Sequence, residues 1–461
     1  MTTIDRGLFK KYDIRGRAAG ANAALTEDFA RVLGRAFGTY LQRVERQTRA
    51  VVGRDNRHTS PALAAAVIDG LRATGCDVLD IGLVSTPLVY WQAVRDGNIG
   101  GLMITGSHLA SEFNGAKLSI GARNLYGDAI QALRQLIEAD DFVDGRGALR
   151  DDPDLIATYV ADMVTRLPMS RALHVVVDAG NGTGGLIGPR LFEALGHRVT
   201  RLFCEPDGSY PNHQPDPQEA RNMAALGAKV IETGADLGIA FDGDADRMGA
   251  VDERGAMIVA DRVLALLARD MLSRHPGAAV VADVLSTQVL FDAVERAGGV
   301  PVMWASGHSL VKARMVETGA LLGGEASGHI FMGEDYFGFD DAYLAAGRLL
   351  QLVAASDGPL SALDATVPTL FSTPEYRPHC PDDAKDLVIQ GVRAALEDQG
   401  EVVAVDGVRI RFERGWGLIR ASNTEPVLSL RFEGETEADA LAYRDLFVAA
   451  LKNYPQVESI I

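Results

Sequence analysis

Three carboxylates occupy every second position of one short segment, Asp242, Asp244 and Asp246 in the run Asp-Gly-Asp-Ala-Asp-Arg. Carboxylates this close repel one another unless a cation lies among them, and hard oxygen ligands suit Mg²⁺ or Ca²⁺. Apolar residues 237–240 precede the segment, so we expect it to follow a strand. Arg247 comes next and is placed to meet an anion that the metal carries. The pattern therefore predicts a magnesium site.

The same acidic segment also fits two other structures. Glu253 is the twelfth residue counted from Asp242, which is the spacing of an EF-hand calcium loop. That loop needs glycine at its sixth position, where this chain has Arg247, and it follows a helix rather than a strand. A solvated acidic turn is the second alternative. We favour the magnesium site because an arginine adjoins the carboxylates.

A serine follows a second apolar run. Residues 102–104 are apolar and lead into Thr-Gly-Ser-His, which contains Ser107. Proteins of the α/β class place their active sites at the carboxyl ends of such strands, so Ser107 can be a nucleophile. A turn or a helix N-cap is the alternative. Lys117, further along, can carry a proton or clamp a phosphate, or it can be an exposed surface lysine.

Two further loops carry groups that bind sugars and phosphates. Glu325, Ser327 and His329 alternate with other residues between glycines and can hydrogen-bond the vicinal hydroxyls of a sugar. A β-turn with a half-buried histidine is the alternative. Residues 420–424 offer a guanidinium, two hydroxyls and an amide, which suit a phosphate monoester, and a structural hairpin turn is the alternative. The side chains of this loop are Arg420, Ser422, Asn423 and Thr424.

The elements that must position these loops repeat three times. Residues 50–81, 174–203 and 279–304 each run from an apolar strand through a polar loop and a helix to a glycine and a second strand. Short apolar strands joined through helices are typical of crossover units in a covered, mostly parallel sheet. The sequence therefore predicts three related α/β domains.

The end of the chain follows a different plan. Prolines between residues 368 and 381 interrupt a stretch without a clear period, which favours a linker or hinge. Strands over residues 408–412 and 427–432 are expected to flank the loop of Arg420, and a helix over residues 437–451 closes the chain. We therefore predict a fourth, α+β domain. The expected domains cover residues 1–150, 151–254, 255–367 and 368–461.

Composition narrows the class of protein. At roughly 150 residues per domain, 461 residues suit several domains, and 47% hydrophobic with 23% charged residues is ordinary for a globular protein. A net charge of −17 repels polyanions, so neither nucleic acid nor an anionic membrane is an expected partner. Three cysteines without a close pair, and no apolar signal or spanning run, favour a cytoplasmic protein. We expect a monomer or a weak dimer.

Five motifs in this order resemble those of the α-D-phosphohexomutases, most closely the bacterial phosphomannomutase/phosphoglucomutase group. They are an opening motif at residues 11–16, a phosphoserine loop at 105–108, a metal loop at 242–247, a sugar-reading loop at 324–329 and a phosphate clamp at 420–424. The resemblance spans essentially the whole chain. Five motifs at compatible spacing are far more specific than any one of them.

This resemblance implies four domains around a central cleft and an isomerase that interconverts hexose 1-phosphate and hexose 6-phosphate of mannose, glucose or both. Ser107 would carry a phosphoryl group and pass it to the phosphosugar. The resulting hexose 1,6-bisphosphate would reorient and return its other phosphoryl group to the serine. Mg²⁺ would be held by Asp242, Asp244, Asp246 and the phosphorylated Ser107.

The resemblance also implies roles for the other side chains. Arg15 and Arg247 would offset the negative charge of the metal cluster. Lys117 or a nearby histidine, His108, would move a proton between Ser107 and the sugar hydroxyl. The sugar hydroxyls O3 and O4 would be bound by Glu325 and Ser327, and the phosphate and further contacts by Tyr12, His308, His329, Arg420, Ser422, Asn423 and Thr424.

The chain departs from the family pattern at three positions. Leu109 and Ala110 stand where the phosphoserine loop usually has Asn-Pro, and Leu285 stands where a lysine often touches the phosphosugar. These changes remove an amide, a φ restraint and a cation. They keep two alternatives open: a phosphoglucosamine mutase, and a low-activity protein that binds sugar phosphates or divalent cations.

Overall fold

The computed structural model describes residues 4–422 and 426–458 and divides into two compact units. The first unit comprises Met1–Val263 and Ser327–Asp364, and the second comprises Leu264–Ala326 and Ala365–Ile461. Within the described residues, no helix combines the length and apolar character that crossing a membrane requires.

Three sheets repeat one parallel arrangement, in which a central strand has a neighbour on each side. In the first unit, β2 (Arg49–Arg54) pairs in parallel with β3 (Asp77–Leu83) and β4 (Gly100–Ile104). The same order recurs in β8 (His174–Asp178) with β9 (Arg198–Leu202) and β10 (Leu237–Phe241), and, in the second unit, in β13 (Ala279–Asp283) with β14 (Val300–Trp304) and β15 (Leu322–Gly324). The prediction of three related α/β domains is confirmed.

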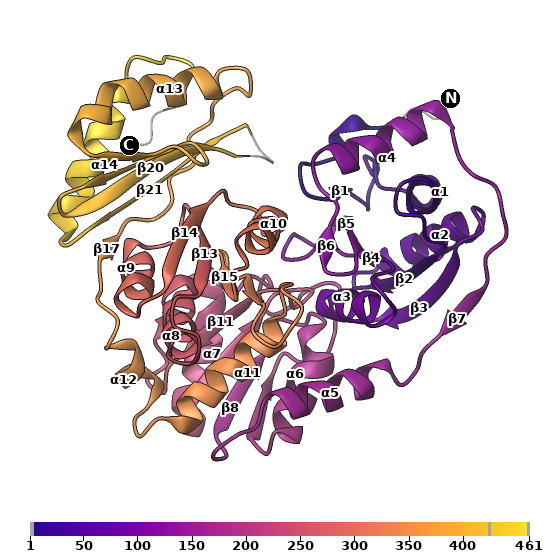
Figure 1. Cartoon of the computed structure of the whole chain (residues 1–461), viewed down its shortest axis with the longest axis horizontal. Helices are drawn as coiled ribbons and strands as arrows, with labels where there is room; N and C mark the ends of the chain where they lie inside the picture. Colours follow the sequence, from indigo (N-terminus) through magenta and orange to yellow (C-terminus); the bar gives the residue numbers. More distant parts are fainter. Residues whose placement is uncertain (1–3, 423–425, 459–461) are drawn as a thin grey trace. The chain divides into compact units, whose positions relative to one another are not determined.

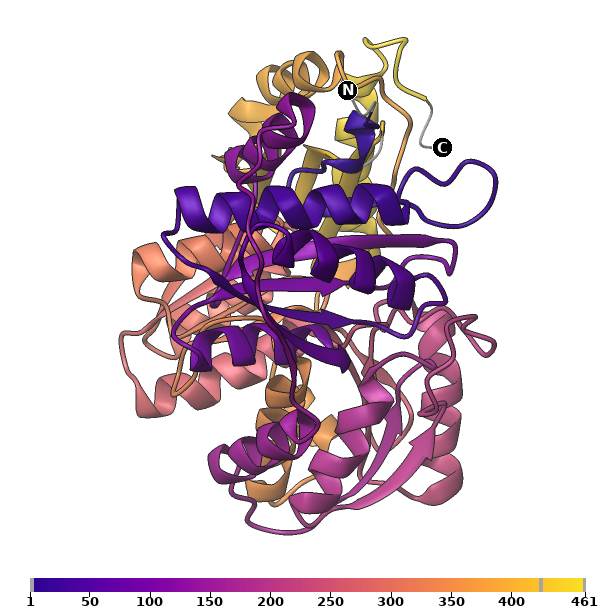
Figure 2. The same cartoon turned by 90° about the vertical axis from the view of Figure 1, so that its right-hand side faces the viewer.

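Helices join these strands as the pattern predicts. The crossover helices α2 (Ser60–Arg72), α6 (Gly184–Ala194) and α9 (Gln288–Arg296) follow the central strands in the chain. Figure 1 and Figure 2 show α2 and its neighbour α1 (Glu27–Arg43) on one face of their sheet and α3 (Thr86–Arg95) on the other. Glycine permits the close contact of α1 with α2, because a Cβ at Gly34 would collide with the carbonyl oxygen of Val67.

The strands that lead into the predicted loops are buried at every position. This holds for β4 and for β10, as expected for sheet strands with helices on both faces. Each is followed by an antiparallel partner, β5 (Phe113–Ile120) beside β4 and β11 (Met248–Val251) beside β10. Each loop is therefore held between a buried strand and a second strand that returns along it.

The other elements complete the two units. In the first unit they are η1 (Arg6–Leu8), β1 (Ile14–Arg17), β6 (Arg123–Asn124), α4 (Asp128–Ala139), β7 (Leu149–Asp151), α5 (Leu155–Arg166), α7 (Ala220–Thr233), β12 (Met257–Ile258), β16 (Ile330–Met332), α11 (Ala342–Ala355) and α12 (Leu360–Asp364). The helix α8 (Ala260–Arg274) begins in the first unit and ends in the second, which also contains α10 (His308–Thr318).

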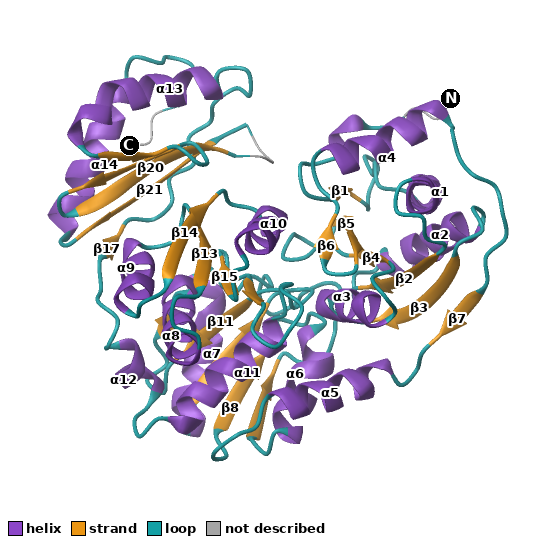
Figure 3. Cartoon of the chain, in the orientation of Figure 1, coloured by secondary structure: helices purple, strands orange, loops and turns teal. Residues whose placement is uncertain are grey.

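The C-terminal part of the second unit is an antiparallel sheet of five strands with two helices on one face (Figure 3). The strands, in spatial order, are β17 (Phe371–Ser372), β21 (Leu428–Gly434), β20 (Gly415–Ala421), β19 (Val408–Phe412) and β18 (Glu401–Val403). The helices are α13 (Lys385–Leu396) and α14 (Glu437–Leu451), with the short η2 (Glu397–Gln399) after α13. The predicted helix over residues 437–451 is α14.

Two details of this module differ from the sequence expectation. Arg420 lies on strand β20 rather than in the loop. The sequence did not indicate this strand, because Gly415 and Gly417 weaken its apolar pattern. The proline-rich segment also pairs with the sheet, because β17 pairs with the edge of β21. In isolated bridges, Tyr376 pairs with Leu430 on β21 and His379 pairs with Val427 just before β21. Backbone pairing at a sheet edge needs no side-chain period, so this pairing left no signal in the sequence.

Candidate active site

The three predicted polar loops follow equivalent strands of the three related sheets. Ser107 comes after β4, Asp242 after β10 and Glu325 directly after β15. Each loop therefore begins at the carboxyl end of a parallel strand, which is where α/β sheets bind ligands. Ser107 and Asp242 belong to the first unit, and Glu325 belongs to the second.

The backbone turns sharply at Ser107, which adopts a positive φ of 51° and is only 3% exposed. Its N–H donates to Thr105 Oγ1 at 2.8 Å, and its Oγ donates to Asp242 Oδ2 at 3.0 Å. His108 Nδ1 lies 3.1 Å from Ser107 Oγ. Gly243 permits this approach of the two loops, because a Cβ there would collide with the carbonyl oxygen of Ser107.

The acidic loop between β10 and β11 is fully buried. Asp242, Asp244 and Asp246 are each 0% exposed, and one carboxylate oxygen from each lies within 4.8 Å of the others. Asp242 Oδ1 accepts the N–H groups of Asp246 at 3.1 Å and Arg247 at 3.2 Å, while Ala245 turns the chain with a φ of 56°. The alternatives of an EF-hand loop and a solvated turn do not fit, since a strand leads in and water is excluded.

Lys117, on β5, is buried against the acidic loop. Its Nζ lies 2.7 Å from Asp244 Oδ2 and also contacts Asp246 Oδ2. Although burial alone lowers the pKa of Lys117, the carboxylates of Asp244 and Asp246 raise it above its usual value. The alternative of an exposed surface lysine is therefore wrong.

The acidic residues fit a divalent cation. Burial raises the pKa of Asp242 well above its usual value, and the charges of Asp244 and Asp246 raise it further. In the described part of the chain, Oδ1 of Asp244 and Oδ1 of Asp246 have no hydrogen-bond partner. Buried carboxylate oxygens without a donor are costly unless a cation binds them. The residues present therefore suit Mg²⁺, whose preferred ligands are oxygens.

Two arginines and a histidine surround the serine. Arg15, on β1, donates from Nε to Asp13 Oδ2 at 2.6 Å and from its guanidinium to the carbonyl of Thr105. Arg247 donates from Nε to His329 Nε2 at 3.0 Å. Burial lowers the pKa of His108 well below its usual value, and the charges of Arg247 and Arg15 lower it further. His108 Nδ1 thus lies at the serine oxygen, 3.1 Å from Ser107 Oγ.

The sequence did not single out the pair that holds the serine loop. The guanidinium of Arg57, 0% exposed, donates to the carbonyls of Ser107 at 2.7 Å and Leu109 at 2.6 Å. It also donates to the carbonyls of Ala110 at 2.6 Å and Phe113 at 3.0 Å, and its Nε donates to Asp55 Oδ2 at 3.1 Å. These bonds use backbone oxygens, so the loop is restrained although Leu109 and Ala110 replace the usual Asn-Pro.

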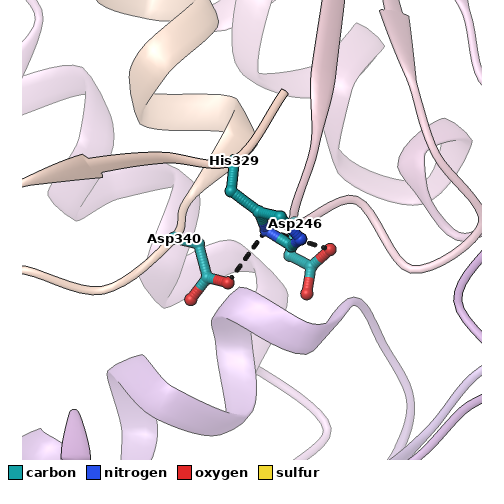
Figure 4. A group of neighbouring side chains, drawn as sticks. All are labelled: Asp246, His329 and Asp340. Atoms are coloured by element: carbon teal, nitrogen blue, oxygen red, sulfur yellow. Dashed lines mark ion pairs between the residues drawn. The ribbon is translucent and has the colours of Figure 1, made fainter. Parts of the chain in front are cut away.

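Two further residues beside the acidic loop were also missed. Thr86 donates from Oγ1 to Asp244 Oδ2 at 2.6 Å and from its backbone N–H to the Asp244 carbonyl at 2.9 Å. Asp340 lies beside His329 and Asp246 (Figure 4), with its Oδ2 3.1 Å from His329 Nδ1. Threonine and aspartate are common residue types, and both lie far from the acidic loop in the sequence. Only the folded chain reveals them.

In the second unit, a chain of polar contacts connects the sugar-reading loop with Arg420. Glu325 Oε1 accepts the N–H of Gly307 at 2.6 Å, next to His308 at the start of α10. The neighbouring Ser306 donates its N–H to Asp406 Oδ2 at 3.1 Å, and Asp406 Oδ2 accepts from Arg420 Nε at 2.9 Å. Asp406 is a further residue that the sequence did not single out. Glu325, His308 and Arg420 are all nearly buried.

The other predicted binding residues are placed less directly. Ser422 accepts Lys385 Nζ at its carbonyl oxygen at 3.0 Å. Ser327 and Tyr12 are half-buried and belong to the first unit, Ser327 at its boundary. Asn423 and Thr424 lie outside the described residues.

Leu285, which replaces a lysine of the family pattern, has a packing role. It is partly buried against the apolar cluster of Val284, Trp416 and Leu418. Its carbonyl oxygen accepts from Arg431 at 2.7 Å. The position therefore joins the parallel sheet to the C-terminal sheet within the second unit.

Comparison with known proteins agrees with this fold. The models of phosphoglucomutase/phosphomannomutase alpha/beta/alpha domains I, II and III match residues 6–144, 157–255 and 260–370, and that of the C-terminal domain matches residues 377–450. A phosphomannomutase/phosphoglucomutase of Pseudomonas aeruginosa is 43% identical over 453 residues, covering 98% of this chain and 96% of that protein. A phosphoglucomutase of Neisseria gonorrhoeae is 41% identical over 463 residues, covering 99% of each.

A crystal structure of a phosphoglucomutase/phosphomannomutase family protein from Burkholderia thailandensis matches with a TM-score of 0.93 and 40% identity, covering 100% of both chains. The chain has three related α/β domains followed by an α+β domain, and a polar loop follows the equivalent strand of each parallel sheet. These features define an α/β enzyme of the mutase class. The chain belongs to the phosphoglucomutase/phosphomannomutase family and is an isomerase. The resemblance expected from the five motifs is confirmed.

Proposed function

We propose that this hexose phosphate mutase interconverts the 1-phosphate and 6-phosphate of glucose, mannose or both, with Ser107 as the group that carries the phosphoryl. The observation that carries the proposal is the contact of Ser107 Oγ with Asp242 Oδ2 at 3.0 Å, beside a buried acidic loop. A serine oxygen there can hold a phosphoryl group against a divalent ion. The names of the relatives from Pseudomonas aeruginosa and Neisseria gonorrhoeae support mannose and glucose.

In the transfer step, the bond from phosphorus to Ser107 Oγ breaks while the attacking sugar hydroxyl bonds to phosphorus. The hydroxyl loses a proton and the serine oxygen gains one. His108, whose Nδ1 lies 3.1 Å from Ser107 Oγ, or Lys117 would move that proton. Arg15 and Arg247 would offset the charge of the phosphoryl group. Mg²⁺, bound by the carboxylates of the acidic loop, would neutralise phosphoryl oxygens as a Lewis acid.

The mutase reaction needs a substrate that binds in two orientations. A hexose 1,6-bisphosphate is the intermediate and the activator in this scheme, because either of its phosphoryl groups can return to Ser107. Glu325 can accept hydrogen bonds from hydroxyls near the middle of the ring, which look alike in both orientations. Arg420 binds the distal phosphate, and its present partner Asp406 keeps the guanidinium aligned until an anion binds.

Kinetics on three sugar phosphates test the proposal. With Mg²⁺ and glucose 1,6-bisphosphate, we expect turnover of glucose 1-phosphate, mannose 1-phosphate or both, and little of glucosamine 1-phosphate. Ser107→Ala abolishes turnover, whereas Ser273→Ala, on the exposed surface of α8, leaves it unchanged. Preference for glucosamine 1-phosphate would identify a phosphoglucosamine mutase. Binding of all three without turnover would identify a binding protein.

The remaining features of the proposal concern the whole molecule. We expect domain boundaries near residues 150, 254 and 367. The free thiols of Cys76, Cys204 and Cys380 are all buried, which supports a cytoplasmic location. The expected monomer or weak dimer is tested by sedimentation of the purified protein.

A further inference from the structure

The starts of two helices hold the backbone of the acidic loop. Thr183, just before α6, donates both its N–H and its hydroxyl to the carbonyl of Gly243, at 3.0 and 3.2 Å. The next carbonyl of the loop, that of Asp244, accepts the N–H of Thr86, the first residue of α3, at 2.9 Å. Two successive carbonyls of the loop are therefore fixed by donors that lie far away in the sequence.

The residues that precede these two helices do not use their hydroxyls as helix caps. Thr183 and Ser85 occupy the N-cap positions of α6 and α3, where threonine and serine usually accept an N–H of their own helix. In the described part of the chain, neither side chain makes such a hydrogen bond. Instead, Ser85 Oγ donates to Thr183 Oγ1 at 3.0 Å and lies 2.6 Å from the hydroxyl of Tyr343 on α11. Two capping hydroxyls thus connect three elements to the acidic loop.

The hydroxyls of Tyr343, Ser85 and Thr183 form a chain whose direction is set by its last acceptor. A carbonyl oxygen can only accept, so Thr183 gives its single hydroxyl proton to Gly243. Thr183 Oγ1 then accepts from Ser85, and Ser85 Oγ accepts from the phenol of Tyr343. All three side chains are 0% exposed, so water does not compete for these bonds. We call these three groups the hydroxyl chain.

The first member of the hydroxyl chain is itself held in place. The Tyr343 ring packs against Phe241, the last residue of β10, with ring centroids 5.0 Å apart. Its backbone N–H donates to Asp341 Oδ1 at 3.1 Å, and the hydroxyl of Tyr159 donates to Asp341 Oδ2 at 2.8 Å. The hydroxyl chain therefore begins at a phenol that is fixed by packing and by the start of α11.

The glycine-rich segment before α6 has the composition of a phosphate-binding loop, but it packs against the acidic loop. A Cβ at Gly182 would collide with the carbonyl oxygen of Gly243, and a Cβ at Gly184 would collide with the side chain of Phe241. The N–H of Thr183 already donates to Gly243, as described above. The start of α6 is therefore occupied by the protein's own loop, where such segments often bind an anion.

Gly243 connects these contacts to the serine. It lies between Asp242 and Asp244, and a Cβ at Gly243 would lie 2.3 Å from the carbonyl oxygen of Ser107. Asp242 Oδ2 accepts the hydroxyl of Ser107 at 3.0 Å. Since Gly243 is in close contact with the backbone of Ser107, a shift of its carbonyl would also move Asp242 against the serine.

We propose that Thr183 and Ser85 are positioning residues for phosphoryl transfer, which fix the carbonyl of Gly243 and so hold the carboxylates of the acidic loop against Ser107. Tyr343 sets the direction of their hydroxyls. This inference rests on the proposed function of Ser107. Both residues act through Gly243 and have no contact with substrate in this scheme.

Amide hydrogen exchange of the acidic loop tests the positioning without turnover. The N–H groups of Asp246 and Arg247 donate to Asp242 Oδ1, so their exchange reports the order of the loop. In the full chain without added Mg²⁺, we expect Thr183→Val to speed their exchange about 2- to 10-fold, the effect of losing one hydrogen bond. Thr183→Ser keeps the hydroxyl and should keep the slow exchange. Equal rates in Thr183→Val and the unmodified chain would overturn the proposal.

Kinetics test whether the loop order matters for transfer. Thr183→Val should lower kcat about 10-fold, the lower end of the usual cost of losing a residue that supports metal ligands, and Thr183→Ser should restore it. KM for the phosphosugar should change little, because Glu325 and Arg420, which are expected to bind the sugar phosphate, belong to the second unit. A kcat that Thr183→Ser fails to restore would overturn the role of the hydroxyl.

A double-mutant cycle tests the order of the hydroxyl chain. Ser85→Ala alone should lower kcat, and it also serves as the test variant if Thr183→Val does not fold. In a Thr183→Val background Ser85→Ala should cost nothing further, because Ser85 reaches the loop through Thr183. Equal costs in the two backgrounds would show that Ser85 does not act through Thr183, which contradicts the proposal.

Two tyrosines provide a matched control. Tyr343 and Tyr159 are both 0% exposed, and their ring centroids lie 6.1 Å apart. Tyr343→Phe removes the first donor of the hydroxyl chain, so it should lower kcat and speed exchange of the acidic loop. Tyr159→Phe removes a hydroxyl that bonds Asp341, so it should lower stability and leave kcat and loop exchange unchanged. Equal losses of kcat in the two variants would show that the hydroxyl chain is merely structural.

The outcomes separate this inference from the function on which it rests. If the unmodified chain is never phosphorylated on Ser107 by glucose 1,6-bisphosphate, the proposed function fails, whatever the exchange of the acidic loop shows. If the unmodified chain is phosphorylated and Thr183→Val keeps full kcat and slow exchange, only the role of Thr183 and Ser85 fails.

Discussion

The ammonium of Lys117 lies 2.7 Å from Asp244 Oδ2, and both side chains are almost wholly buried. This pair joins β5 to the acidic loop that follows β10. Lys117 contacts Asp244 and Asp246, and the charges of Arg15 and Arg247 also act on the acidic loop, so its three carboxylates are partly balanced by side chains of the protein.

Lys117→Met tests that balance. Removing one partner of a buried ion pair costs about 3 to 5 kcal/mol, because Asp244 and Asp246 are left as uncompensated buried charges. We expect a lower unfolding temperature without Mg²⁺ and a larger increase on adding Mg²⁺ than in the unmodified chain, measured by calorimetry. Equal increases in both proteins would contradict a cation site at these carboxylates.

Thr86→Val tests whether a residue outside the acidic loop tunes its metal affinity. The change removes the 2.6 Å hydrogen bond to Asp244 Oδ2 while keeping the shape of the side chain. We expect Mg²⁺ to bind about 10- to 100-fold more weakly, by isothermal titration. Thr74→Val is the matched control, because Thr74 is also buried and its hydroxyl donates to the carbonyl of Leu71 and not to the acidic loop. A similar loss of affinity in both variants would refute the role of Thr86.

Arg57→Lys tests the support of the serine loop. A lysine keeps the charge but cannot reach the carbonyls of Ser107, Leu109, Ala110 and Phe113 together, so buried acceptors lose their donors. We expect a loss of about 1 to 3 kcal/mol of stability, the cost of leaving one buried acceptor, the carbonyl of Ser107, without its donor. Turnover should also fall at saturating substrate. Arg43→Lys, at an exposed pair with Asp141, should change neither stability nor turnover.

His213 gives a prediction for pH. Although burial lowers its pKa, the hydrogen bond and charge of Asp178, 3.0 Å away, raise the pKa above the usual 6.5. A raised pKa in the folded chain adds stability that is present below the unfolded value and is lost as the pH rises through the folded value. We expect His213 to titrate above 6.5 by NMR, and His213→Gln to destabilise the chain more in acid than in base. A midpoint at or below 6.5 would contradict this.

The sequence could predict the chemistry that is local in the chain. The acidic run from Asp242 to Asp246 and the serine of Thr-Gly-Ser-His carry their signal within a few residues, and the repeated strands place both loops at equivalent ends. The proximity of Ser107 and Asp242 in the fold follows from that repetition. Short apolar runs likewise predicted most strands of the three parallel sheets.

Other residues act across distances that the sequence does not reveal. Thr86 reaches Asp244 over 158 positions, and Arg57 reaches Ser107 over 50. Asp340 lies against His329, and Asp406 accepts from both Ser306 and Arg420, which only the folded chain reveals. Strand β20 was missed because two glycines interrupt its apolar pattern, which placed Arg420 in a loop instead of on a strand.

The central claim is that Ser107 carries a phosphoryl group, and intact-mass analysis tests it most directly. The purified chain is incubated with glucose 1,6-bisphosphate and Mg²⁺ and its mass compared with that of Ser107→Ala. The account predicts a species about 80 Da heavier that peptide mapping places on Ser107 and that is missing from the alanine variant. An unchanged mass, or the same increase in Ser107→Ala, would contradict it.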